Sequence, residues 1–212
     1  MDPLQERLTR IGLEVVGGRG FVLGGGHAIG LHGMGTRPSE DIDLFSSVRG
    51  TPAAVADDLI GAYRREGLAV TVSLRTGDLV QMEVADARGH QCKVDIGVFW
   101  RARSPVRLDI GPVLHPDDAV AGKMDALFNR WAPRDFLDID AVLASGRYTR
   151  QQLLSVLAEH NPGFSTGMFL ESLSYLHRIP DRDFAAYGVS QERIEAMRRE
   201  FRRWEEDLRA GT

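Results

Sequence analysis

Apolar and polar residues alternate with a period of two only in the first half of this chain, and this asymmetry constrains the fold most. Alternation of this kind is typical of β-strands, whereas apolar spacings of three and four residues are typical of helices. From residue 117 onward the strand pattern largely disappears and helical spacing takes over. We therefore expect an α+β protein, with a mixed β-sheet core over residues 1–111 followed by a helical half over residues 112–212.

The first half combines strand patterns with turn and helix signals. Its β-rich runs cover residues 21–23, 41–45, 69–75, 79–85 and 93–99. Thr76-Gly77-Asp78 joins two of these runs and predicts a hairpin. Thr51-Pro52 is typical of an N-cap followed by proline at the first helical position, so a helix is expected to run to about Glu66. A further helix is expected from His27, after a run of three glycines.

The second half predicts a series of helices separated by proline and glycine. They are expected around residues 117–131, 134–144, 149–160, 165–178 and 190–209. The last helix carries a line of apolar residues that predicts a packing seam, formed by Ile194, Met197, Phe201, Trp204 and Leu208. The arginines beside this seam are interpreted as a solvated face, with contact to RNA as the alternative: Arg198, Arg199, Arg202 and Arg203.

Composition excludes several classes of protein. With 43% hydrophobic and 26% charged residues the chain resembles ordinary globular proteins. Its net charge of −4 shows no domain-wide basic excess of the kind that nucleic-acid-binding domains carry. No apolar run is long enough for a membrane span, and residues 1–10 lack the apolar segment of a secretory signal. The single cysteine, Cys92, cannot form an internal disulfide. We expect a cytoplasmic protein with no membrane partner.

Paired carboxylates form the main chemical signal. On a strand, Asp41 and Asp43 lie on one face, roughly 7 Å apart, while Ile42 and Leu44 lie on the other. Mg²⁺ favours such oxygen ligands together with substrate phosphates, although an Asp-x-Asp pair is commonly only a solvated strand face. A third acid, Asp95, alternates with apolar residues in a similar strand.

If the two acidic strands are neighbours, Asp95 joins Asp41 and Asp43 at one polar face. A cluster of that kind suits two-metal phosphoryl transfer. The alternative for Asp95 is an ion pair with Lys93, two residues away on the same face.

The segments before the acidic strand contain features suited to phosphate binding. Gly24-Gly25-Gly26 follows an apolar strand and precedes a helix, where glycine permits close backbone approach and the helix start offers free N–H groups. A tight turn is the simpler interpretation of this run. Thr36, Arg37 and Ser39 lie in the loop just before Asp41. Arg37 could neutralise a γ-phosphate, or it could be an ordinary surface arginine.

These motifs, taken in order, resemble the DNA-polymerase-β-type nucleotidyltransferase superfamily, and more narrowly the AbiEii-type nucleotidyltransferase toxins, including the mycobacterial tRNA-modifying branch. The first motif comprises Gly25-Gly26-His27-Ala28, Leu31-His32-Gly33 and Thr36-Arg37-Pro38-Ser39-Glu40-Asp41-Ile42-Asp43-Leu44. The second comprises Lys123-Met124-Asp125-Ala126-Leu127, Arg130 and Arg134-Asp135-Phe136-Leu137-Asp138. The resemblance covers residues 21–45 and 119–143, and Asp95 matches only by position and residue type.

The resemblance implies a Mg²⁺-dependent enzyme that transfers a nucleoside monophosphate from an NTP to the 3′ end of tRNA, as the toxin of a toxin–antitoxin system with a cognate antitoxin partner. The implied metal ligands are Asp41, Asp43 and Asp95, and the implied general base is either Asp95 or Asp135. The implied nucleotide contacts are Gly25, Gly26, Arg37, Ser39, Lys123, Arg134 and Asp138. Many members have Gly-Ser where this chain has Gly25-Gly26, so a serine contact to phosphate is missing.

Several alternatives stay open at this level. The acceptor could be a small molecule such as an aminoglycoside, or the chain could be a non-catalytic nucleotide-binding module. The acids and cations of the second motif could form interhelical ion pairs instead of a nucleotide pocket. Ser39 could be a site of inhibitory phosphorylation, as the resemblance implies, or it could merely cap its loop. Gly163-Phe164-Ser165-Thr166-Gly167 matches a hydrolase motif by chance, because no strand precedes it.

Overall fold

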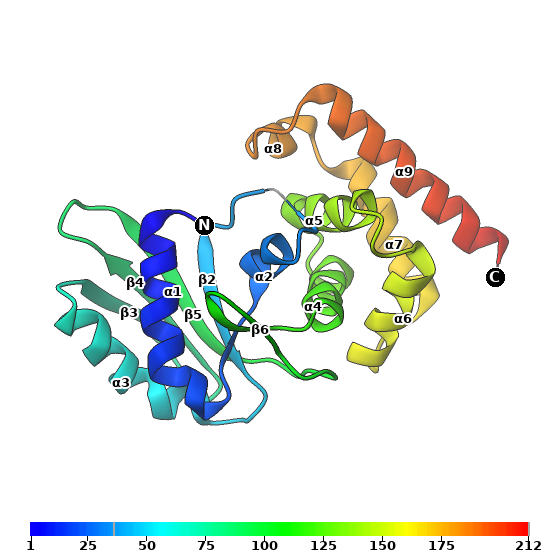
Figure 1. Ribbon diagram of the computed structural model, residues 1–212. Coiled ribbons are helices and arrows are strands. Elements are labelled where there is room, and N and C mark those ends of the chain that lie inside the picture. Colours follow the sequence, from blue (N-terminus) through cyan, green and yellow to red (C-terminus); the bar gives the residue numbers. More distant parts are fainter. Residues whose placement is uncertain (36, 212) are drawn as a thin grey trace. The chain divides into compact units, whose positions relative to one another are not determined.

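The computed structural model describes every residue except Thr36 and Thr212 (Figure 1). The chain divides into two compact units. The first unit consists of Met1–His32 and Pro38–Ala119, and the second of Gly33–Arg37 and Val120–Thr212. A mixed sheet in the first unit and helices in the second confirm the predicted α+β class. Among the described residues, no helix combines the length and apolar character needed to cross a membrane.

The first unit is built on a seven-stranded sheet with the order β3-β4-β5-β2-β1-β7-β6. Its strands are β1 (Val22–Leu23), β2 (Asp41–Ser46), β3 (Ala69–Arg75), β4 (Leu79–Ala85), β5 (Gln91–Val98), β6 (Val106–Leu108) and β7 (Gly111–Val113). Two pairs are parallel, β2 with β5 and β1 with β7, and the other pairs are antiparallel. The sheet is therefore mixed, and the predicted hairpin forms between β3 and β4.

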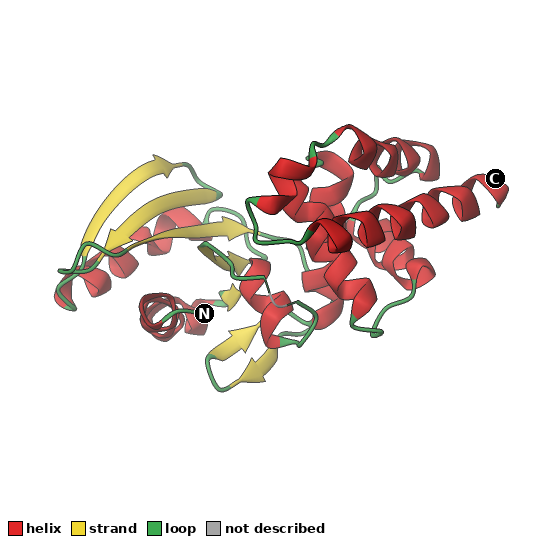
Figure 2. Cartoon of the chain, turned by 90° about the horizontal axis from the view of Figure 1, so that it is seen from above, coloured by secondary structure: helices red, strands yellow, loops and turns green. Residues whose placement is uncertain are grey.

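Two long helices cover one face of the sheet. Figure 2 shows α1 (Pro3–Val16) and α3 (Thr51–Arg65) on the same side of the strands. Ile42 and Leu44 of β2 are fully buried, as the alternation of apolar residues requires for a sheet with one covered face. Because successive side chains of a strand point to opposite faces, Asp41 and Asp43 lie on the face away from α1 and α3.

The first unit also differs from expectation at several helix boundaries. The sequence pattern missed α1, whose start is stabilised by a capping box between Asp2 and Gln5. Helix α2 (Gly25–Leu31) begins two residues before His27. Thr51 is the first residue of α3 and not its N-cap. The capping position belongs to Gly50, whose φ of 77° favours glycine.

The second unit is helical. Its helices are α4 (Pro116–Asn129), which begins in the first unit, α5 (Pro133–Ala144), α6 (Arg150–His160), α7 (Thr166–Tyr175), α8 (Asp181–Ala185) and α9 (Gln191–Ala210). A 3₁₀ turn over Leu176–Arg178 follows α7, so the helix expected over 165–178 ends earlier, and α8 was not predicted.

The seam of α9 is the core of the second unit. Ile194, Met197, Phe201 and Trp204 are each at most 1% exposed, whereas Leu208 is only partly buried. Phe201, Trp204 and other buried rings pack at centroid distances of 5.3–5.9 Å. Of the four flanking arginines, Arg198 is not part of a solvated face. Its guanidinium donates to the carbonyl of Ile179 and to the Asp181 carboxylate, both at 2.6 Å.

Candidate functional site

The acidic strands β2 and β5 are parallel neighbours, as the predicted cluster requires. Asp43 is the register partner of Asp95, and Asp41 is the register partner of Lys93. Neighbouring strands lie about 4.8 Å apart, so Asp43 and Asp95 are side by side on the sheet. All three acids alternate with buried apolar residues, which places them on the face that α1 and α3 leave open. The structure therefore brings Asp41, Asp43 and Asp95 to one face.

The Asp95 carboxylate is held through only one of its oxygens. Its Oδ2 accepts hydrogen bonds from Gln81 Nε2 at 2.8 Å and from Lys93 Nζ at 2.9 Å. Its Oδ1 is buried and has no hydrogen-bond partner among the described residues. A buried acceptor without a partner costs about 1–3 kcal/mol, so this oxygen is suited to a group that the free chain does not supply. The Lys93 ion pair foreseen as the alternative is present, and it leaves Oδ1 unused.

Asp41 is held by the loop that precedes β2. Ser39 Oγ donates to Asp41 Oδ1 at 3.1 Å, and the Ser39 carbonyl accepts from Gln5 Nε2 at 2.7 Å. Ser39 and Gln5 are both buried. The helix α1, which the sequence pattern did not predict, therefore anchors the residue that orients Asp41. Thr36 of the same loop lies outside the described residues.

The glycine run makes a close backbone approach to Asp43. The Gly24 N–H donates to the Asp43 carbonyl at 2.8 Å. Gly25 has a φ of +58°, and a Cβ atom built there would lie 1.8 Å from Asp43 Oδ2. Only glycine fits this position, on conformational and steric grounds. Gly26 follows as the second residue of α2. The run is therefore more than a tight turn, because its lack of side chains makes room for the Asp43 carboxylate.

The carboxylates are not arranged as a complete metal shell. Within the residues that the structure describes, no group of three or more His, Cys, Asp or Glu side chains could hold a metal ion. Mg²⁺ commonly takes only one or two protein carboxylates and completes its shell with water and substrate phosphates. The side-by-side pair of Asp43 and Asp95 is compatible with that smaller requirement.

The second unit places two predicted cations on one acid. Lys123 Nζ lies 2.8 Å from Asp138 Oδ2, and Arg37 Nε donates to Asp138 Oδ1 at 3.1 Å. Burial by itself would raise the pKa of Asp138, but the charges and hydrogen bonds of Lys123 and Arg37 lower that pKa below its ordinary value. The Arg37 guanidinium also lies 5.5 Å from the centre of the Tyr187 ring. Arg37 is therefore not an ordinary surface arginine.

The other predicted residues of this unit have different surroundings. Asp135 is fully buried, and its carboxylate accepts from Arg130 Nε and from the Ala132 N–H, both at 3.0 Å. Its pairing with Arg130 is the kind of contact that the ion-pair interpretation expected, and its bond to the Ala132 N–H also caps the start of α5. Arg134 is partly exposed, and its guanidinium has no ion pair with another described residue. The positive charge of Arg134 is therefore available to a bound anion.

The hydrolase-like motif is explained by local structure. Ser165 is the N-cap of α7 and accepts a hydrogen bond from the Met168 N–H at 3.3 Å. The segment before it is the helix α6, whereas a nucleophilic serine of that motif needs a preceding strand. The match to the motif is therefore a matter of chance.

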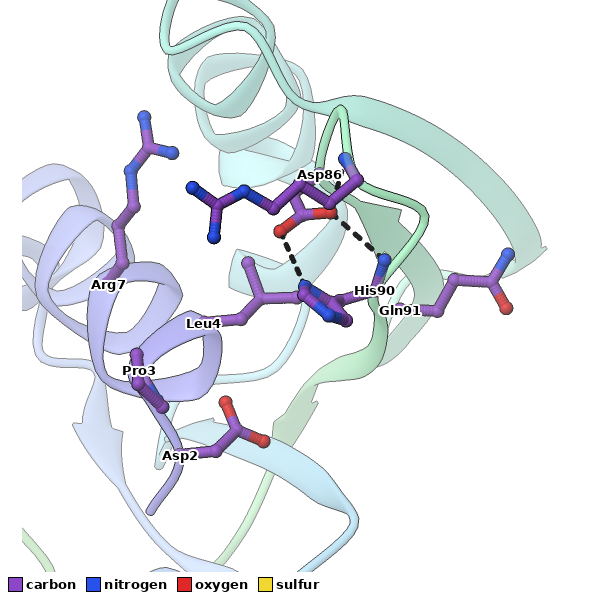
Figure 3. Close-up of a pocket in the computed structure, with 8 residues that line it drawn as sticks. Asp2, Pro3, Leu4, Arg7, Asp86, His90 and Gln91 are labelled. Carbon is purple, nitrogen blue, oxygen red and sulfur yellow. Dashed lines mark hydrogen bonds and ion pairs between the residues drawn. The ribbon is translucent and has the colours of Figure 1, made fainter.

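A separate cavity of about 580 Å³ lies between the start of α1 and the turn that joins β4 to β5 (Figure 3). It is lined by Asp2, Pro3, Leu4, Arg7, Asp86, Arg88, His90 and Gln91. His90 Nδ1 and Asp86 Oδ2 are 2.9 Å apart there, and this contact lowers the pKa of Asp86. None of the predicted site residues lines this cavity, so the sequence motifs and the cavity mark different places of the first unit.

Sequence reasoning missed two residues that contact the candidate acids or their loop. Gln81 of β4 is the register partner of Asp95, and Gln5 of α1 holds the Ser39 loop. The alternation of β4 places Gln81 on its polar face, which was a usable signal once the order of the strands was known. The capping-box pattern of Asp2 and Gln5 was a usable signal for the start of α1, but nothing in the local sequence indicated that Gln5 contacts the Ser39 loop.

Several solved structures share the fold of this chain. In a search of solved structures, the chain is similar to JHP933 from Helicobacter pylori, with 15% identity over 99% of this chain and 98% of that chain and a TM-score of 0.54. It is also similar to MenT4, a nucleotidyltransferase toxin from Mycobacterium tuberculosis, with 18% identity over 93% of this chain and 81% of that chain and a TM-score of 0.57. At these identities the likeness shows the fold alone. A search of the curated proteins found no match.

A comparison with protein families is decisive. Residues 13–211 match the family described as nucleotidyl transferase AbiEii toxin of type IV toxin–antitoxin systems. This match spans both units and includes each predicted site residue. The chain therefore belongs to the AbiEii family of nucleotidyltransferase toxins.

Proposed function

We propose that this protein is a Mg²⁺-dependent enzyme that transfers a nucleoside monophosphate from an NTP to the 3′ end of tRNA, and that it blocks translation as the toxin partner of a cognate antitoxin. The observation that carries the proposal is the pair of carboxylates on β2 and β5, where Asp43 is the register partner of Asp95. A tRNA substrate would place the reaction in the cytoplasm.

Two features of the first unit fit a divalent ion at this pair. The buried Asp95 Oδ1 has no hydrogen-bond partner among the described residues, and the Asp43 carboxylate keeps its place beside it only because Gly25 has no Cβ atom. Asp43 and Asp95 would hold the ion, and Asp41 would be a further ligand. When bound, a divalent ion supplies charge neutralisation for the phosphates and lowers the pKa of an attacking hydroxyl.

The residues of the chain would share the remaining work. The acceptor hydroxyl would lose its proton to a carboxylate, for which Asp95 and Asp135 are the candidates, a bond would form from its oxygen to the α-phosphorus, and the bond to pyrophosphate would break. Both carboxylates accept hydrogen bonds in the free chain, Asp135 from Arg130 and the Ala132 N–H, and Asp95 from Gln81 and Lys93. Gly25 and Gly26 would bind phosphate oxygens through the backbone.

Cations of the second unit would stabilise negative charge on the triphosphate as pyrophosphate leaves. Lys123 and Arg134 are the candidates, with Arg37 as a third. Asp138 would hold Lys123 and Arg37 in place, since it contacts both cations in the free chain. Replacing any of these cations is therefore expected to impair mainly the reaction with NTP and not to change the choice of acceptor.

The direct test is incorporation of labelled NTPs into purified tRNA in the presence of Mg²⁺, with wild-type protein and Asp43→Asn compared at equal concentration. The proposal expects wild-type protein to extend the 3′ end and Asp43→Asn to lose at least about 100-fold, as removal of a charge-organising group does in other active sites. Aminoglycosides are included as alternative acceptors. Equal inactivity of both proteins toward every NTP and acceptor would overturn the proposed catalysis, and labelling of an aminoglycoside alone would overturn the tRNA assignment.

We also propose Ser39 as the point at which phosphorylation would silence the enzyme. Its hydroxyl donates to Asp41, so a phosphate there would replace a hydrogen-bond donor with about −1.5 to −2 charges beside the acids. Co-expression with the antitoxin followed by mass spectrometry tests this. Loss of activity while Ser39 stays unmodified would show that the antitoxin acts in another way.

A further inference from the structure

We propose that Gln81 is a positioning residue for the transfer reaction, which holds the Asp95 carboxylate so that its Oδ1 is presented to the metal. This inference rests on the proposed function. It concerns a strand, β4, that carries none of the residues predicted from sequence motifs.

Gln81 is built into the sheet next to Asp95. The two residues are register partners on the antiparallel strands β4 and β5, and Asp95 is in turn the register partner of Asp43 on β2. One row across three strands therefore runs from Gln81 through Asp95 to Asp43. The backbone ladder determines this row, so the amide of Gln81 reaches Asp95 Oδ2 at 2.8 Å from a rigid element.

The hydrogen bond determines which oxygen of Asp95 stays available. A carboxylate can rotate about its Cβ–Cγ bond and exchange its two oxygens. Because both Gln81 and Lys93 donate to Oδ2, this rotation is opposed and Oδ1 stays buried without a partner. Groups that orient metal ligands in this way commonly affect metal affinity or activity by 10- to 100-fold.

Gln81 is better suited to this role than Lys93. The Lys93 side chain is 49% exposed, on a flexible stem, and its charge competes with a metal ion for the same carboxylate. The amide of Gln81 is neutral, so it orients Asp95 without cancelling the charge that a cation needs. On the other side of β4, a β-bulge between Val72 and Leu74 shifts the register of β3. The residue of β3 opposite Gln81 is therefore the apolar Leu74.

The matched control is Glu83, which lies two residues further along β4 on the same face and is exposed. It is the register partner of Lys93. Gln81→Met removes the amide while keeping the length of the side chain, and Glu83→Met removes an exposed carboxylate two residues away. Both variants are expected to have melting temperatures close to that of the wild type.

The first measurement is binding of Mn²⁺ alone to the full chain, followed by electron paramagnetic resonance. We expect Gln81→Met to weaken Mn²⁺ binding by about 10- to 100-fold and Glu83→Met to weaken it by no more than about threefold, through the loss of one exposed charge. The second measurement is a double-mutant cycle with Asp95→Asn. If Gln81 acts through Asp95, Gln81→Met has no further effect in the Asp95→Asn background. In NTP transfer, the loss should appear in kcat and in the Mg²⁺ requirement, with little change in the KM for tRNA.

The outcomes separate this inference from the proposed function. If Asp43→Asn abolishes Mn²⁺ binding and transfer while Gln81→Met matches the wild type, the inference is wrong and the proposed function stands. Additive effects of Gln81→Met and Asp95→Asn would likewise overturn the inference. If the wild type neither binds Mn²⁺ nor transfers nucleotides, both the inference and the proposed function are overturned.

Discussion

Gly25 offers the sharpest single test of the acidic site, because alanine there would push directly on Asp43. A Cβ at this position would lie 1.8 Å from Asp43 Oδ2, whereas real Cβ contacts stay beyond 3.0 Å. The carboxylate oxygen must therefore move by more than 1 Å. A displacement of about 1 Å at a reacting group can cost on the order of 100-fold in rate. We expect Gly25→Ala to lose at least about 100-fold in NTP transfer and to bind Mn²⁺ more weakly.

Alanine at Gly25 also carries a backbone penalty, which the control must separate from the effect on Asp43. Gly50 provides that control, since it also has a positive φ, of 77°, but a Cβ there would meet nothing within 4 Å. A left-handed backbone costs a non-glycine residue about 1–2 kcal/mol, which corresponds to a melting temperature lower by about 2–8 °C in a chain of this size. Both variants should show this loss in thermal unfolding, and only Gly25→Ala should lose function. Wild-type transfer by Gly25→Ala, or an equal loss in Gly50→Ala, would refute the reasoning.

Three further predictions concern other parts of the chain. Lys93→Met should tighten Mn²⁺ binding several-fold, because an ammonium and a divalent ion about 6 Å apart repel by roughly 1.4 kcal/mol in water. Weaker Mn²⁺ binding by this variant would contradict the argument. Asp138 has a pKa lowered in the folded protein, so its contribution to stability is present above the unfolded pKa of about 3.9 and is lost as pH falls through the folded pKa. In urea unfolding, the difference between wild type and Asp138→Asn should therefore shrink below about pH 4, and a difference that grows there would refute the argument. Ser165→Ala should lower the stability of the helical unit by about 0.5–2 kcal/mol through loss of the α7 cap and leave transfer unchanged, whereas a catalytic loss without destabilisation would point to a role for its hydroxyl.

Local patterns predicted the elements that depend on near neighbours in sequence. The hairpin strands were placed at Ala69–Arg75 and Leu79–Ala85, because a short polar turn between two β-rich runs is itself a local signal. The apolar seam of α9 was predicted from spacing, and four of its five residues are buried. Short elements were missed: β6 and β7 have three residues each, too few to show a period.

Other errors arose where tertiary contacts decide the outcome. Arg198 was expected in a solvated face, yet it is held by the Ile179 carbonyl and by Asp181 from the segment before α9. From its place in the loop before β2, Arg37 was interpreted as a contact to a γ-phosphate or as an ordinary surface arginine. In the structure its guanidinium donates to Asp138, 101 residues later in the chain. A long side chain finds partners that its own sequence neighbourhood does not reveal.

The sequence by itself determined that Asp41, Asp43 and Asp95 face away from a buried layer, because alternation along a strand is a property of the backbone. It also predicted the family, through motifs that occur in order along the chain. Only the tertiary structure decided that β5 lies beside β2 in a register that pairs Asp43 with Asp95, and that Gln81 enters the same row from β4. Strand order and register depend on how the whole sheet packs, so no short segment encodes them.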